Sequence, residues 1–118
     1  MGRKVGNARS VRVTVPESTT IVQGNFYYLD GFLGMATKSI TTGAGETKDL
    51  ILDIEPGEVE TSQINTSDAF AKASKVYYDT TNKRFTNTAS GNRFAGIVTQ
   101  AKDANNVIWF VFKPTDQE

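Results

Sequence analysis

The stretch "SKVYYDTTNKRFTNTASGNRFAGIVTQA", residues 74–101, decides the fold class. Val76-Tyr77-Tyr78 is typical of a strand and "RFTNT" of its return strand, because the intervening "DTTNK" is rich in turn-forming residues. "ASGN" predicts a second turn, and "RFAGIVTQA" predicts a further strand with Gly96 in its interior. A glycine inside a strand usually marks a bulge or a close backbone approach. The stretch therefore predicts a rigid β unit without obvious chemistry.

Strand and turn signals continue on both sides of this stretch. "SVRVTV" alternates from Ser10, and Pro16 either stops this strand or places it at an edge. Asp30-Gly31 predicts a hairpin between "FYYL" and "FLGMA". "LILDI" is a strand that Pro56-Gly57 closes, and the final run "VIWFVF" is apolar on both faces, as expected of a central strand. A helical pattern occurs only near residues 67–73, where Ser67 is a suitable cap.

We therefore predict an all-β (mainly β) fold, a small β-sandwich or barrel of short strands with at most one short helix near residues 67–73. A length of 118 residues fits a single domain. We expect a flexible basic N-terminal arm at residues 1–9, a single β domain at residues 10–114 and a C-terminal tail at residues 115–118. The basic residues of the arm are Arg3, Lys4 and Arg9.

The composition excludes several kinds of chemistry. Lysine plus arginine and aspartate plus glutamate number 13 each, so no net charge draws the protein to nucleic acid or to acidic membranes. There is no cysteine and no histidine, which removes thiolate chemistry, the commonest general base and the commonest metal ligand. No apolar run approaches the roughly 20 residues that span a bilayer. We expect neither nucleic-acid nor membrane partners.

The polar motifs also fail as catalytic or binding signatures. "TTGAGETKDL", residues 41–50, has one residue between its glycines and an aspartate after Lys48, so it matches neither a phosphate-binding loop nor a dinucleotide fingerprint. The acidic residues near the Pro-Gly turn, Glu55, Glu58 and Glu60, are interpreted as solvated charge. We therefore expect no catalytic residue, no cofactor and no metal site, and we predict that the protein is not an enzyme.

Aromatic side chains are numerous for so short a chain, with seven phenylalanines, four tyrosines and one tryptophan. Most are expected to fill the core. Those on a second strand face are suited to an oligomer interface, since tyrosine and tryptophan combine an apolar body with a polar group. Stacking on nucleic-acid bases is less favoured because basic residues do not cluster beyond the N-terminal arm.

Several segments together resemble the capsid cement or decoration proteins of tailed phages, over most of the chain. They are the early alternating strand, the "GFLGMA" core at Gly31 to Ala36, "KVYYDTTNKRFTNTASGNRFAGIV" and the final strand "VIWFVF". Members of this family are sometimes labelled recombinases, but no nucleotide-binding loop supports that here. The basic lead "MGRKVGNARS" is longer than the family pattern.

The resemblance implies a structural role on the virion. It implies a mainly β protein, made in the host cytoplasm, that forms homotrimers on the outer surface of the icosahedral capsid, binds the major capsid protein and stabilises the shell. For "NARSVRVTV" we expect strand addition to a neighbour's open sheet edge. The candidate contacts to the capsid or between subunits are Arg3, Lys4, Arg9, Val11, Arg12, Val13, Tyr28, Phe32, Tyr78 and Trp109.

Two alternative functions stay open at this point. One is a β-rich carbohydrate- or receptor-binding module displayed on the virion, which would use exposed tyrosine or tryptophan against a sugar. The other is a small barrel that binds single-stranded nucleic acid, which would show salt-dependent affinity for single-stranded DNA.

Overall fold

The computed structural model describes residues 10–113. These residues form strands and turns without a helix, so the all-β prediction is confirmed. The strands are β1 (Ser10–Val15), β2 (Thr20–Ile21), β3 (Phe26–Leu29), β4 (Phe32–Ala36), β5 (Ile40–Thr41), β6 (Lys48–Asp53), β7 (Gly57–Thr61), β8 (Lys75–Asp79), β9 (Arg84–Thr86), β10 (Arg93–Gln100) and β11 (Ile108–Phe112).

The capped helical turn expected near residues 67–73 does not form. Asn65 closes the turn instead: its side-chain Oδ1 accepts the Ser67 N–H at 3.1 Å, and its carbonyl accepts the Asp68 N–H at 3.0 Å. Asparagine competes well for nearby backbone donors, which favours a turn over a helix. Phe70 then enters the core with 3% of its surface exposed.

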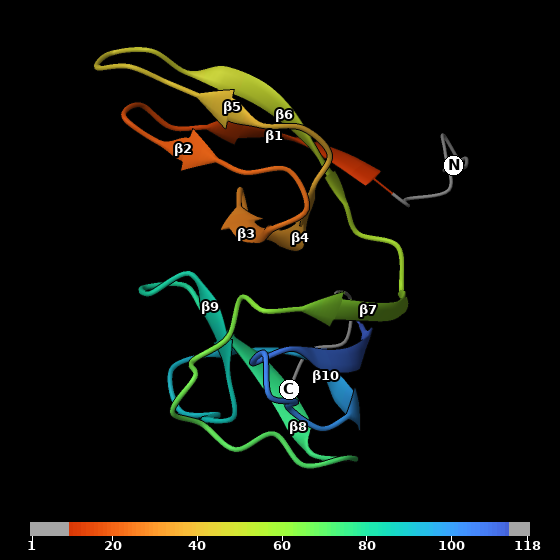
Figure 1. Ribbon diagram of the computed structural model, residues 1–118. Helices are drawn as coiled ribbons and strands as arrows, with labels where there is room; N and C mark the ends of the chain where they lie inside the picture. Colours follow the sequence, from red (N-terminus) through yellow and green to blue (C-terminus); the bar gives the residue numbers. More distant parts are fainter. Residues whose placement is uncertain (1–9, 114–118) are drawn as a thin grey trace, which may run out of the picture.

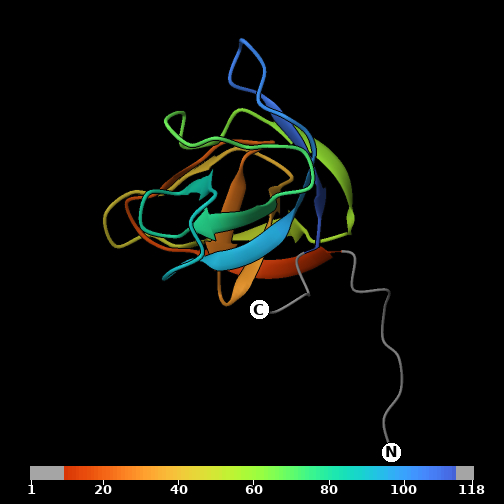
Figure 2. The same cartoon turned by 90° about the horizontal axis from the view of Figure 1, so that it is seen from below.

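Two main sheets build the molecule. One is four-stranded in the order β1-β6-β4-β3, the other is five-stranded in the order β7-β11-β10-β8-β9, and β2 and β5 form a small third sheet. All the strand pairs within these sheets are antiparallel. Figure 1 shows β3 and β4 between β1 and β6 on one side and β7, β8 and β10 on the other. Seen from below, the strands curl around a common centre (Figure 2).

The β3–β4 hairpin separates two hydrophobic cores. Phe26 and Leu33 belong to the larger core, which the five-stranded sheet supplies with most of its side chains. Tyr27 and Ala36 belong to the smaller core beneath β1 and β6. Because neighbouring side chains on a strand point to opposite faces, one hairpin can fill both cores. This layering explains why its residues are apolar on both faces.

Packed aromatic rings form the centre of the larger core. The Phe26 ring lies 5.1 Å from that of Phe85 and 5.1 Å from that of Phe112, both in edge-to-face geometry, which aromatic pairs favour. The Tyr78 hydroxyl donates to the Phe26 carbonyl at 2.8 Å. Burial raises the pKa of Tyr78 above its ordinary range, so this hydroxyl remains protonated.

Gln63 joins the same hairpin to the segment after β7. Its Oε1 accepts the Phe26 N–H at 2.6 Å, and its Nε2 donates to the Phe26 carbonyl at 2.8 Å and to the Lys83 carbonyl at 3.0 Å. The side-chain amide thus occupies the place of a paired backbone residue. It connects β3 with the five-stranded sheet where no strand ladder runs between the two sheets.

Two sequence signals have the expected geometry. Asp30 and Gly31 both have positive φ, 53° and 86°, in the tight turn between β3 and β4. At Gly96 the β8–β10 register shifts, and a Cβ there would lie 2.0 Å from the Val111 carbonyl oxygen. Gly96 therefore marks both a bulge and a close backbone approach, as predicted.

Candidate contact surface

The structure distributes the predicted contact residues over several regions. Arg3, Lys4 and Arg9 lie outside the described residues. Val13 and Tyr78, each 1% exposed, lie in the smaller and the larger core respectively. Their side chains are thus core residues and not surface contacts, because alternation places them on the covered face of each strand.

The first strand is already part of the protein's own sheet. Across the β1–β6 ladder Val11 pairs with Leu52 and Arg12 pairs with Ile51, and Val11 packs against the smaller core. The outer edge of β1 is also partly occupied, since Asp30 Oδ2 accepts the Thr14 N–H at 2.8 Å. Of the segment "NARSVRVTV", Ser10 to Val15 are therefore already paired within this sheet, and the residues before Ser10 lie outside the described residues. This corrects the expectation that all of it reaches a neighbour.

Tyr28 and Phe32 remain exposed but do not form one patch. Tyr28 is 38% exposed, and the guanidinium carbon of Arg93 lies 5.2 Å from its ring centre. Phe32 is 42% exposed and pairs with Leu29, so it occupies the opposite face of the hairpin. The Arg93 contact is a cation–π interaction, which fixes the tyrosine ring.

Trp109 lies on the outer face of the five-stranded sheet. It is 37% exposed and stands opposite Glu60 of β7. A hollow of about 230 Å³ beside it is lined by Glu58, Val59, Glu60 and Trp109. Val111 and its partner Ile97, both half-buried, continue the apolar surface across the sheet. Trp109 is thus a predicted contact residue that is exposed beside a hollow and next to further apolar side chains of the same sheet face.

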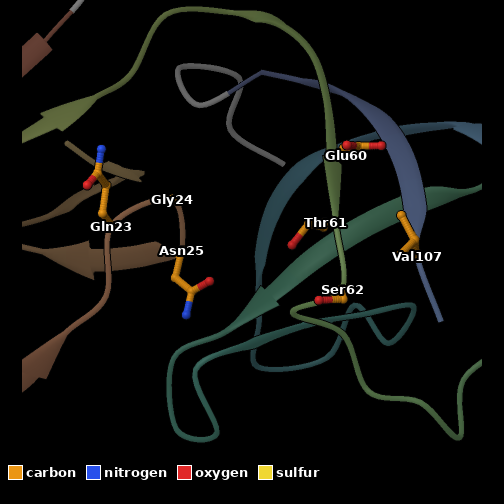
Figure 3. A pocket seen from close by; sticks show the side chains of 7 residues that line it. All are labelled: Gln23, Gly24, Asn25, Glu60, Thr61, Ser62 and Val107. Carbon is orange, nitrogen blue, oxygen red and sulfur yellow. The ribbon is translucent and has the colours of Figure 1, made fainter. Parts of the chain in front are cut away.

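A second, polar hollow lies between the β2–β3 turn and the end of β7. Its volume is about 330 Å³. Figure 3 shows Gln23 and Asn25 on one side and Glu60, Thr61, Ser62 and Val107 on the other. Glu60 lines both hollows, so the polar and the apolar recess meet at β7. Glu58 and Glu60 are exposed, in agreement with their interpretation as solvated charge, and they also line these hollows.

Within residues 10–113 no group of three or more acidic, histidine or cysteine side chains is placed to hold a metal ion. The pKa of Asp79 is lowered, first by the Asn82 side chain and then by the Asn82 and Thr81 backbone N–H groups, which is the hydrogen bonding of a hairpin turn. No helix in that part of the chain is long and apolar enough to cross a membrane.

The described residues missed by sequence reasoning include exposed apolar side chains. Val22 is 48% exposed and Ile51 is 36% exposed. Ile51 stands opposite Arg12 on the outer face of the four-stranded sheet. The period-two pattern of "LILD" places Ile51 on the face opposite Leu50 and Leu52, so the sequence already indicated that Ile51 is exposed.

Three comparisons with known proteins were informative to different degrees. A family model described as phage cement protein matches residues 5–112. A search of curated proteins gives no match, and a search of solved structures gives none either.

Proposed function

The chain belongs to the phage cement protein family, and from this premise we propose that it binds the outer surface of an icosahedral tailed-phage head and stabilises the shell. The family is one of structural phage proteins associated with the capsid. The observation that carries the proposal is the match over residues 5–112, which includes both sheets and both cores. The partner we propose is the major capsid protein.

A rigid body supports this role. The β3–β4 hairpin contributes side chains to both hydrophobic cores, and Gln63 and Tyr78 both bond to the backbone of Phe26. A protein that bridges neighbouring capsid subunits resists their separation only if its own parts do not move relative to one another. Interlocked cores and buried hydrogen bonds provide that stiffness.

The proposed contacts are those that remain accessible or lie before Ser10. Trp109 is the central candidate, because large aromatic side chains at the centre of an interface carry much of the binding energy. Arg12, Tyr28 and Phe32 are exposed, and Val11 is partly so. The basic residues of the N-terminal segment complete the set: Arg3, Lys4 and Arg9.

We further propose a homotrimer. Three weak contacts made by one rigid trimer reinforce one another, and the gain in avidity is roughly 10²–10⁴-fold when the geometry allows simultaneous binding. A shell offers the same contact many times over, so a symmetric oligomer engages several capsid subunits at once.

The test mixes the purified protein with capsids that lack it. We expect saturation at a fixed ratio to the major capsid protein and a higher temperature of capsid disruption. Trp109→Ala should weaken binding by about tenfold or more. Val22→Ala, directly after β2 (Thr20–Ile21), is the control for loss of an exposed apolar group.

Absence of capsid binding would refute the proposal. Glycan binding by the isolated protein would then favour the carbohydrate-binding alternative. Salt-dependent binding to single-stranded DNA would favour the nucleic-acid alternative.

A further inference from the structure

Among the strands of residues 10–113, β7 lies at an edge of the five-stranded sheet and pairs only with β11. The Lys113 N–H donates to the Ala95 carbonyl at 2.8 Å, so this pair of residues is hydrogen-bonded between β11 and β10. Hydrogen-bonded and non-hydrogen-bonded pairs alternate in an antiparallel ladder, so the next pair, Gly96 with Phe112, is not hydrogen-bonded. The backbone N–H and C=O of Phe112 therefore point away from β10 and toward β7. Glu58 and Glu60 pair with Val111 and Trp109, whose backbone groups point to β10 and not to β7. The backbone N–H and C=O groups of Glu58 and Glu60 therefore point to the open edge.

The side chains around this edge suit an inserted strand. The side chains of an added strand would alternate between the two faces of the sheet. On one face they would lie beside the Trp109 hollow, and on the other beside the polar hollow lined by Gln23 and Asn25. Recessed binding sites on both faces of an open edge are the arrangement used in strand-addition recognition. Backbone hydrogen bonds then supply affinity, and the hollows supply selectivity.

Charge indicates which strand would fit. The segment from Glu55 to Thr61 contains Glu55, Glu58 and Glu60 and no basic residue. The first nine residues contain Arg3, Lys4 and Arg9 and no acidic residue. Residues 114–118 contain Asp116 and Glu118 and no basic residue, so like charge disfavours them at this edge.

Length and connectivity favour the arm of another molecule. Nine extended residues span about 30 Å, whereas the five residues of β7 (Gly57–Thr61) cover about 17 Å. The arm therefore has residues to spare for reaching a neighbour. Ser10 pairs with Asp53, and a ladder continued from there along the same molecule meets Pro56, which lacks an N–H group.

We propose that the open edge of β7 binds the basic N-terminal segment, residues 1–9, of a second copy of this chain as an added strand. The contact joins two different surfaces, so it is heterologous, and it closes into a ring when each arm reaches the next copy around a rotation axis. A ring of three such contacts is the trimer described under Proposed function, on which this inference rests. Each subunit gives one arm and receives one.

The first experiment measures the oligomeric state of the full chain by light scattering at low ionic strength, without capsids. We expect the full chain to be oligomeric and the chain lacking residues 1–9 to be monomeric. Glu60→Lys should raise the dissociation constant by about tenfold, since it replaces an attraction by a repulsion. Asp49→Lys makes the same charge change at an exposed position on β6 and should leave the constant unchanged.

Exchanging the charges of the arm and the β7 edge distinguishes loss of this contact from a folding defect. The double variant Arg3→Glu with Lys4→Glu should weaken association as Glu60→Lys does, and combining all three changes should restore it. A monomeric full chain, an unchanged oligomer after deletion of residues 1–9, or equal effects of Glu60→Lys and Asp49→Lys would each overturn the proposal.

A second experiment identifies the molecule that supplies the arm. The chain has no cysteine, so a tagged Lys4→Cys chain mixed with a Glu60→Cys chain can join only through the introduced thiols. We expect a mixed disulfide-linked dimer, and much less of it when Asp49→Cys replaces Glu60→Cys. Equal amounts of mixed dimer with Glu60→Cys and Asp49→Cys, or a disulfide that forms only within one molecule when Lys4→Cys and Glu60→Cys are combined in one chain, would overturn the assignment.

The outcomes also separate this inference from capsid binding. A monomer that still saturates capsids keeps the capsid role and refutes the arm contact. An arm-dependent trimer that ignores capsids keeps the arm contact and refutes the capsid role.

Discussion

Gln63→Ala is the substitution that tests most directly how the two sheets are held together. It removes three hydrogen bonds, two from Nε2 to the Phe26 and Lys83 carbonyls and one from the Phe26 N–H to Oε1. Each net contribution is about 1 kcal/mol, and a partly buried N–H left without a partner costs about 1 kcal/mol more. The Phe26 carbonyl keeps the Tyr78 hydroxyl as a donor, so the loss of its bond to Gln63 costs little, and the other two bonds and the unpaired N–H determine the total. We therefore expect a loss of about 3 kcal/mol.

The assay is urea unfolding followed by fluorescence and far-ultraviolet circular dichroism, together with thermal unfolding. A loss of about 3 kcal/mol lowers Tm by roughly 12–24 °C for a domain near 100 residues. Gln23→Ala is the matched control, because it removes an exposed glutamine side chain without a described hydrogen bond, and we expect a change within about 0.5 kcal/mol. Equal stabilities of the two variants would refute the reasoning.

Gln63→Glu refines the same test through pH. The carboxylate keeps an acceptor for the Phe26 N–H but places negative oxygen beside the Phe26 and Lys83 carbonyls. Folding therefore raises the pKa of the new side chain above its ordinary value of about 4.3. The folded state then binds the proton more tightly than the unfolded state, so the variant gains stability relative to the native protein as the pH falls from 7 toward 4. A loss of relative stability over this range would contradict the assigned geometry.

Three further predictions follow. Gly96→Ala should cost more than about 3 kcal/mol, because its Cβ would lie 2.0 Å from the Val111 carbonyl oxygen, whereas Gly57→Ala, with nothing within 4 Å, should be nearly neutral in urea unfolding. Asp79 has a lowered pKa, so its stabilising contribution is complete above 3.8 and is lost as the pH falls from 3.8 through the folded-state value; the stability difference from Asp79→Ala should shrink between pH 6 and pH 2. Deleting residues 1–12 should lower Tm, measured by thermal unfolding, further than deleting residues 1–9, because only the longer deletion removes the pairs from Ser10 to Arg12 with Asp53 to Ile51.

The local features were predictable because local chemistry determines them. Asp30-Gly31 adopts the positive φ values that a tight hairpin needs, and few other residue pairs do so readily. Gly96 is a glycine because the Val111 backbone leaves no room for a side chain. Pro16 directly follows the last residue of β1.

Burial of individual side chains was less predictable. The period-two pattern says that the two faces of a strand differ, but a tyrosine is compatible with either environment. Tyr78 is buried because its hydroxyl reaches the Phe26 carbonyl, 52 positions away in the chain. Tyr28 stays 38% exposed beneath Arg93. Long-range partners thus decided which aromatic residues are buried and which stay exposed.

The amino-acid sequence by itself determined the all-β class, the main turns, the absence of histidine and cysteine chemistry and the phage cement resemblance, since these depend on composition and on residues close together in the chain. Tertiary structure alone decided that two cores share the β3–β4 hairpin, that Gln63 bonds to Phe26 and that β7 lies at an open edge beside Trp109. Those features arise from pairing between distant segments. Alternation along a single strand does not specify which neighbour covers it or which edge is left unpaired.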